Sequence, residues 1–102
     1  YDLNYVLDPE RDKKKPVARV RGPDGDLILE LWTDRPGLQF YNAVTTDIKV
    51  PGLGGRIYGK YSGLCLEDQM LPDALNNPGF ASIFCTPDRP YSHWCEIEIK
   101  QA

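Results

Sequence analysis

Short runs of alternating apolar and polar residues, separated by Gly and Pro, dominate this 102-residue sequence. Between Leu27 and Trp32 each successive side chain would point to the opposite face of an extended chain. No segment shows the 3.6-residue spacing of an amphipathic helix. The pattern therefore predicts an all-β fold, an antiparallel sandwich built from short strands.

The expected elements follow from the turn residues. Length alone indicates one domain. The sequence Gly-Pro-Asp-Gly-Asp at 22–26 is typical of a hairpin turn, the Gly-rich residues 51–60 of a connection, and the Pro-rich residues 72–90 of a loop. The chain opens as though inside a structural element, at residues 1–7. Strands are expected at 17–21, 27–32, 38–41, 63–69 and 94–99.

Charge limits the partners of the chain. It carries 12 Lys and Arg against 15 Asp and Glu, which gives a net charge of −3 and disfavours binding to a phosphate backbone. The basic run at 11–15 contains no aromatic residue for base stacking, and we expect it to be a solvated loop. No apolar run approaches the roughly 20 residues that span a membrane. Neither nucleic acid nor a membrane is an expected partner.

The cysteines point to a reducing compartment. Three of them, in no CxxC spacing, do not make a disulfide framework. Reduced, buried thiols are expected, which favours a cytoplasmic location, although one disulfide with one free thiol stays open. His93 and Cys95 share a strand face, but two ligands do not make a zinc site.

Two polar residues in the middle of predicted strands are the first candidates for function. Gln39 and Glu67 each lie between apolar residues that would fill the opposite face of the sheet. They either meet water, as one face of an antiparallel sheet commonly does, or line a cleft for a polyhydroxylated ligand. The Gly-rich residues 52–55 do not form a phosphate-binding loop, because Lys60 is followed by Tyr61 and not by Ser or Thr.

Ordered motifs over the whole chain resemble one enzyme family. They are YDLNYVL at 1–7, PGLQFY at 36–41, GKYSGLCLEDQ at 59–69, LPDA at 71–74 and NNPGF at 76–80. In this order they resemble the C-terminal part of the aldose 1-epimerases, or galactose mutarotases. The resemblance implies that residues 1–102 are a single segment, the C-terminal portion of a larger mutarotase-like β-sandwich.

The resemblance also implies a reaction and roles for three residues. Mutarotases interconvert the α and β anomers of free aldoses by acid–base ring opening. By this match Glu67 is the general base, and Asp2 and Gln39 hold sugar hydroxyls. The family's catalytic histidine lies upstream of the segment that begins at Asp2, and His93 is not expected to replace it.

Several further expectations follow from the resemblance. The chain alone would be inactive, and its partners would be a hexose substrate and the N-terminal remainder of the same protein. We expect no metal and no organic cofactor, because acid–base ring opening needs neither.

Two other readings stay open. One is a non-catalytic carbohydrate-binding or mutarotase-derived module that acts on another small molecule. Its ligand would stack on exposed aromatic residues: Trp32, Tyr41, Tyr61 and Trp94. The other is a free-standing small β-sandwich, which requires the chain to be complete.

Overall fold

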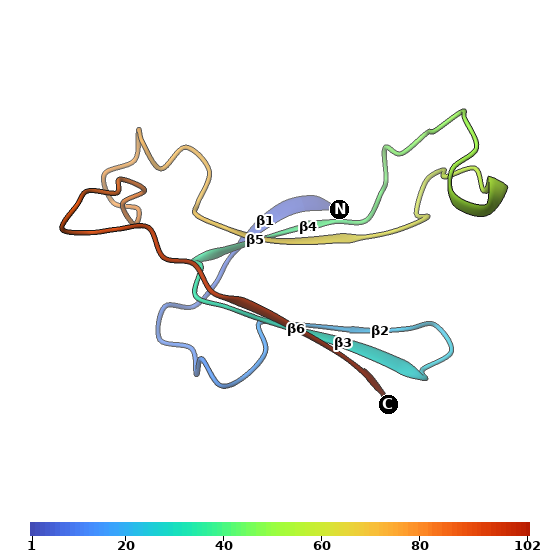
Figure 1. Ribbon diagram of the computed structural model, residues 1–102, viewed down its shortest axis with the longest axis horizontal. Coiled ribbons are helices and arrows are strands. Elements are labelled where there is room, and N and C mark those ends of the chain that lie inside the picture. Colours follow the sequence, from blue (N-terminus) through green and yellow to red (C-terminus); the bar gives the residue numbers. More distant parts are fainter.

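A computed structural model describes all 102 residues, and its regular elements are strands with one exception, joined by long loops (Figure 1). Its only helical element is the three-residue 3-10 helix η1 (Leu53–Gly55) inside the Gly-rich connection. The all-β prediction is confirmed. The strands are β1 (Asp2–Val6), β2 (Ala18–Arg21), β3 (Leu27–Thr33), β4 (Gly37–Tyr41), β5 (Cys65–Gln69) and β6 (Cys95–Gln101).

The turn between β2 and β3 forms where the sequence predicts it. The Gly22 amide donates to the Leu27 carbonyl at 2.9 Å, and the Gly25 amide donates to the Gly22 carbonyl at 2.9 Å. Gly25 has φ of 75°, a conformation that costs glycine nothing and other L-residues a steric clash.

The strands form two antiparallel sheets of three strands each. The first sheet has the order β1-β4-β5, and the second has the order β2-β3-β6. Consecutive strands β3 and β4 belong to different sheets, so residues 34–36 carry the chain from one sheet to the other. Figure 1 shows the two sheets facing each other near this crossing and diverging away from it. This arrangement is a β-sandwich, as predicted.

Arg11 fixes the crossing from the side. Its guanidinium donates to the carbonyls of Thr33 at 3.1 Å and Arg35 at 2.8 Å, and to the Asp8 carbonyl at 3.0 Å. The loop between β1 and β2 is thereby tied to the end of β3 and to the crossing that follows it. The expectation that the whole basic run is solvated is therefore wrong for Arg11, because three carbonyl oxygens replace water around its charge.

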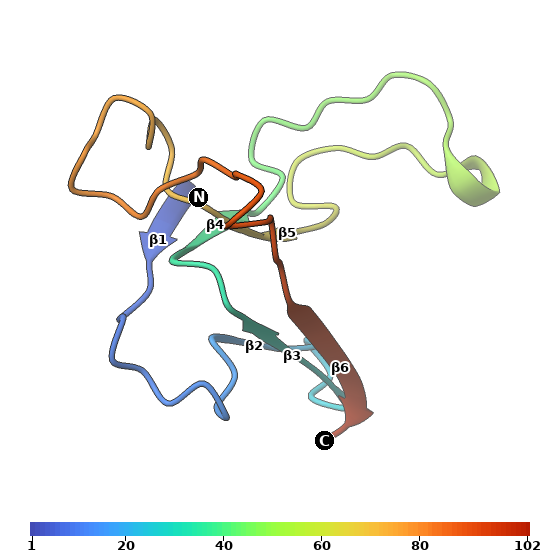
Figure 2. The same ribbon diagram turned by 60° about the vertical axis from the view of Figure 1, so that its left-hand side comes forward.

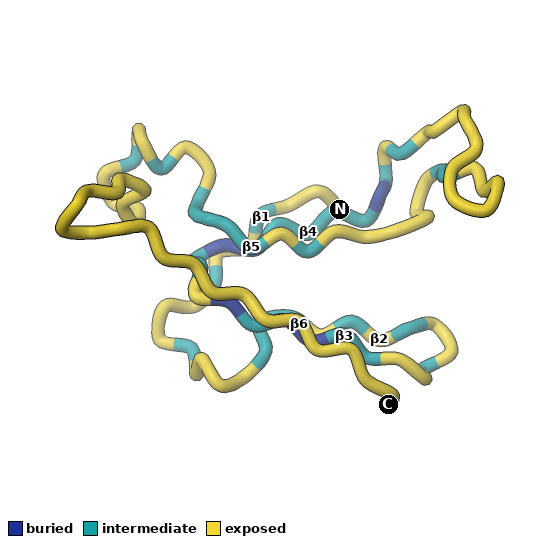
Figure 3. The backbone as a smooth tube through the Cα atoms, in the orientation of Figure 1, coloured by how far each residue is buried: buried dark blue, intermediate teal, exposed yellow.

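The core lies between the sheets and is small. Leu31 of β3 is 1% exposed and Leu38 of β4 is 4% exposed (Figure 3). A mainly apolar cavity of about 460 Å³, open to solvent, lies between the first sheet and β2. Its lining includes Leu38, Phe40 and Leu66 from the first sheet and Ala18 and Val20 from the second.

Much apolar surface nevertheless stays uncovered within these residues. Ile97 and Ile99 of β6 pair with Leu31 and Leu29 on the inner face of the second sheet, yet they are 58% and 67% exposed. The radius of gyration is 16.7 Å, against about 13 Å for a compact domain of 100 residues. Both side chains point to the inner face but stay uncovered, because the sheets diverge before β6 meets the first sheet.

The outer face of the second sheet carries a charge cluster around Glu30. Glu30 is only 3% exposed, because Arg19 of β2 and Lys100 of β6 lie over it from both sides and pair with its carboxylate. Hydrogen bonds from Lys100 and then from Arg19 lower the pKa of Glu30 below its ordinary value of 4.5. The three strands are thus joined by side chains as well as by their backbones.

This cluster predicts a pH-dependent stability. Because the folded-state pKa of Glu30 lies below its unfolded value, the carboxylate stabilises the fold above about pH 4.5 and loses this effect as the pH falls through the folded pKa. We expect Glu30→Gln to lower the thermal midpoint at pH 7, and the difference from wild type to shrink towards pH 3. The more exposed Glu98 supplies the control variant Glu98→Gln, and a constant difference at all pH values would contradict the prediction.

Candidate functional site

Polar side chains form rows across the outer face of the first sheet. The register places Asn4, Gln39 and Glu67 directly opposite one another on β1, β4 and β5. Asp2 lies opposite Tyr41 in the neighbouring row. Residues opposite one another in antiparallel strands point to the same face. The three residues expected to form the site, Asp2, Gln39 and Glu67, therefore share one face, opposite to the inner, apolar one.

Two hydrogen bonds fix the orientation of the amides on this face. The Gln39 amide nitrogen donates to Asp2 Oδ1 at 2.6 Å, and the Gln69 amide nitrogen donates to Asn4 Oδ1 at 2.9 Å. The second bond crosses β4 above Gly37, where a Cβ would lie 2.8 Å from Asn4 Oδ1. A side chain at position 37 would force Asn4 to move, so glycine is required for this contact.

Glu67 is the least constrained member of the face. Its side chain is exposed, and its carboxylate takes part in none of the ion pairs of the chain. Its strand neighbours Leu66 and Asp68 point to the inner face. A free carboxylate on a strand, beside an oriented amide, can accept a proton or a hydroxyl hydrogen bond from a bound ligand.

Tyr41 closes one end of the face. Its hydroxyl lies 2.8 Å from Thr45 Oγ1 and 3.3 Å from Thr46 Oγ1, and these hydrogen bonds lower its pKa. Beyond it the chain leaves β4 and returns to β5 through a long projecting loop (Figure 2). Ala43 and Tyr61 pair at the base of this loop through a 3.1 Å backbone hydrogen bond. Both have positive φ, 58° and 64°, a strained conformation for residues other than glycine.

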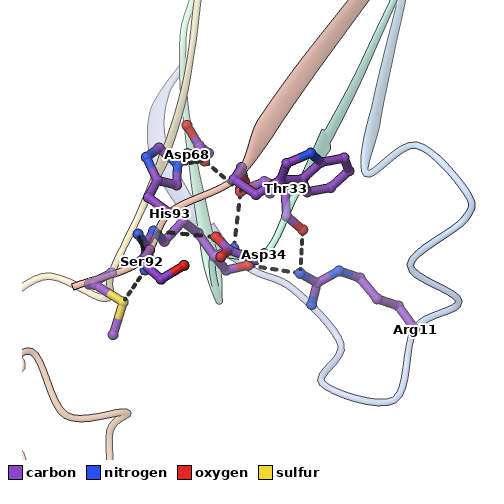
Figure 4. A network of polar contacts seen from close by, with 9 residues as sticks. Arg11, Thr33, Asp34, Asp68, Ser92 and His93 are labelled. Carbon is purple, nitrogen blue, oxygen red and sulfur yellow. Dashed lines mark hydrogen bonds and ion pairs between the residues drawn. The ribbon is translucent and has the colours of Figure 1, made fainter. Parts of the chain in front are cut away.

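Asp68 has a separate environment on the inner side of β5. Its Oδ2 accepts hydrogen bonds from Thr33 Oγ1 at 2.5 Å and from His93 Nε2 at 2.6 Å (Figure 4). Although partial burial opposes the shift, these bonds hold the pKa of Asp68 below its ordinary value. His93, the single histidine of the chain, is therefore directed at Asp68 and away from the face that carries Glu67.

Asn4 and Gln69 were not among the predicted site residues. Both lie on the same face as Glu67 and order the amide network there. The alternation of side chains along a strand could have indicated that both residues lie on this face. Asn4 is two residues from Asp2, and Gln69 is two residues from Glu67.

The cysteines are free, but the expectation that they are buried is wrong. Cys65, Cys85 and Cys95 are all exposed. The chain contains no group of three or more His, Cys, Asp or Glu side chains that could hold a metal ion. No helix has the length and apolar character to cross a membrane.

The proposed aromatic platform does not form as one surface. Trp32 points to the outer face of the second sheet, where its indole nitrogen donates to the Lys14 carbonyl at 3.1 Å. Tyr41 lies on the outer face of the first sheet. The sandwich separates these two faces, so one ligand cannot stack on both side chains.

The fold and the polar face define an antiparallel β-sandwich with a carboxylate–amide surface on one sheet. Residues 1–98 match the family described as aldose 1-epimerase. The chain is 41% identical over 101 residues to the galactose mutarotase of Rattus norvegicus and 38% identical to that of Homo sapiens. It is 34% identical to the aldose 1-epimerase of Escherichia coli (strain K12). The chain belongs to the aldose 1-epimerase family.

These relatives are much longer than the chain. Each alignment covers 97% of the chain but 29% of the relative. The matched length identifies the family but leaves more than two thirds of each relative without a counterpart in this chain.

The surroundings of Cys95 predict a difference in thiol reactivity. Burial, and then the charge of Asp68 and a hydrogen bond to it, raise the pKa of the Cys95 thiol. Because the thiolate is the reactive form, we expect iodoacetamide at about pH 8 to label Cys95 several-fold more slowly than Cys65 or Cys85. Peptide mass spectrometry measures the three rates, and Asp68→Asn should speed labelling of Cys95 alone. Equal rates at all three thiols would contradict the prediction.

Proposed function

We propose that the chain supplies the general base and part of the sugar site of a mutarotase that interconverts the α and β anomers of a free hexose. The observation that carries this proposal is the shared face of Asp2, Gln39 and Glu67. Glu67 lies opposite Gln39, whose amide is oriented by Asp2. A sugar ring offers hydroxyls in every direction, and an acceptor, an oriented amide and a free carboxylate on one face suit such a ligand.

The reaction needs two proton transfers in each direction. Glu67 takes the proton of the anomeric hydroxyl while an acid protonates the ring oxygen. The C1–O5 bond breaks, and its electron pair remains on O5 as a hydroxyl, which gives the open-chain aldehyde. Rotation about C1–C2 presents the other face of the carbonyl. The reverse transfers then close the ring as the other anomer, and Glu67 returns to its ionised form.

The acid must come from outside these residues. His93 is bound to Asp68 on the inner side of β5, where it cannot reach a ligand over Glu67. We therefore assign residues 1–102 to the C-terminal portion of a larger sandwich, whose N-terminal remainder brings the acid histidine. The choice of the C-terminal portion rests on the resemblance of the ordered motifs. The coverage of 29% of each relative and the exposed apolar side chains of β6 support a larger sandwich. They argue against a free-standing sandwich.

The compartment follows from the thiols. Three free cysteines are suited to a reducing environment, and on this basis we propose that the protein is cytoplasmic.

The role of Glu67 predicts the effect of removing its charge. We expect Glu67→Gln in the intact protein to lower kcat at least about 100-fold, the usual contribution of a general base. Polarimetry of freshly dissolved α-D-galactose measures the rate of anomer interconversion. The 102-residue chain alone is expected to give no rate above the uncatalysed one.

Glu96→Gln is the matched control for this variant. Glu96 is also an exposed strand glutamate, but it lies on the outer face of the second sheet opposite Trp32. It should retain the wild-type rate. A wild-type rate in Glu67→Gln would rule out the assigned role.

Asp2 predicts a different kinetic signature. If it holds a sugar hydroxyl and orients Gln39, its loss weakens ground-state and transition-state binding alike. We expect Asp2→Asn to raise KM about tenfold and to leave kcat within about twofold of wild type. A tenfold change corresponds to roughly 1.4 kcal/mol, about the contribution of one hydrogen bond to a charged group. Polarimetric rates over a range of sugar concentrations separate the two constants. An unchanged KM would contradict the binding role.

A further inference from the structure

We propose that Asp68 is a positioning residue for Glu67. Asp68 attaches β5 to the second sheet on the inner side. It thereby sets the position and direction of the Glu67 carboxylate on the outer side. The inference rests on the proposed function of Glu67 as the general base.

The carboxylate of Asp68 contacts the end of β3 and the segment that leads into β6. Thr33 ends β3, and its hydroxyl donates to Asp68 Oδ2 at 2.5 Å. His93 precedes β6, and its Nε2 lies 2.6 Å from the same oxygen. Cys95 opens β6 and pairs with Thr33 in the ladder. One carboxylate therefore joins β5 to the end of β3 and to the connection that leads into β6 (Figure 4).

Thr33 is itself held in place. It is 2% exposed, and its hydroxyl oxygen accepts a hydrogen bond from the Arg35 amide at 3.0 Å. Its carbonyl accepts from Arg11 at 3.1 Å. The partner of Asp68 thus adjoins the crossing between the sheets, which these hydrogen bonds hold in place.

The position of β5 relative to the second sheet depends on this contact, because its other restraints, the ladder with β4 and the hydrogen bond from Gln69 to Asn4, lie within the first sheet. Within these residues β5 pairs with β4 alone and forms an edge of the first sheet. Long loops enter and leave it, at residues 42–64 and 70–94. The inner cavity borders Leu66, so the apolar packing beneath the strand is incomplete.

Adjacent residues of a strand move together. Asp68 and Glu67 share a peptide plane and point to opposite faces, so a tilt of β5 that releases Asp68 displaces the Glu67 carboxylate. A displacement of about 1 Å at a reacting group can cost about 100-fold in rate. The predicted loss is smaller, because β4 still pairs with β5 along its length.

The test compares three variants of the intact protein by polarimetry. Asp68→Ala removes the anchor, and we expect kcat to fall about tenfold with KM within twofold of wild type. Asp68→Asn keeps an oxygen that accepts from Thr33, and it should retain at least a third of kcat. Glu30→Gln is the control: it removes a buried carboxylate of the second sheet that has no contact with β5, and it should retain wild-type kcat despite lower stability.

Hydrogen exchange gives a readout that does not depend on activity. We expect Asp68→Ala to raise exchange of the β5 amides that pair with β4, while Glu30→Gln leaves them unchanged. Wild-type kcat or unchanged β5 exchange in Asp68→Ala would overturn the positioning role. So would an equal loss of kcat in Asp68→Asn, which indicates an effect of charge, or in Glu30→Gln, which indicates general destabilisation.

Failure of the proposed function has a different signature. Wild-type rate in Glu67→Gln overturns the assignment of the base, and with it any catalytic positioning by Asp68. An inactive Glu67→Gln together with a fully active Asp68→Ala overturns the positioning role alone.

Discussion

The crossing between β3 and β4 constrains the rest of the structure. The four backbone steps from Thr33 to Gly37 can span at most roughly 14 Å, close to the separation of about 10 Å between packed sheets. The two sheets must therefore meet at this end, and Arg11 holds the junction by donating to the carbonyls of Thr33 and Arg35. Leu31 and Leu38, the most deeply buried apolar side chains, flank the same junction. Away from it the sheets diverge, and burial falls.

Alternation along β4 and β5 then separates two kinds of surface. On the inner side the strands present Leu38, Phe40 and Leu66 to the cavity. On the outer side they present Gln39 and Glu67. Asp68 is the exception, a carboxylate on the inner side, and burial of this charge is compensated by hydrogen bonds from Thr33 and His93. A polar contact therefore replaces apolar packing at the point where the strand that bears Glu67 meets the second sheet.

The sequence predicts the face on which Glu67 lies because side-chain direction in a strand depends only on residue parity. The same rule, with the turn residues, places the strands to within two residues at each end. It does not predict strand order, so the adjacency of β1 and β5 to β4, and with it the bond between Asp2 and Gln39, required the structure. The contacts of Asp68 and Arg11 also depend on how the two sheets stack, which involves residues far apart in the chain. Parity also places Ile97 and Ile99 on the inner face, but it does not tell what covers them, and both stay exposed.

The polar face and the core therefore need different amounts of the protein in order to form. The carboxylate–amide face is complete as a row once β1, β4 and β5 pair, because cross-strand neighbours define it. A core requires apolar surface from every direction, and here the inner face of β6 has no opposing layer. Three strands are enough to bring Asp2, Gln39 and Glu67 to one face, but an enclosed cleft and a dry interior need more. A protein over three times longer, as its relatives are, can add both around a face that is already in register.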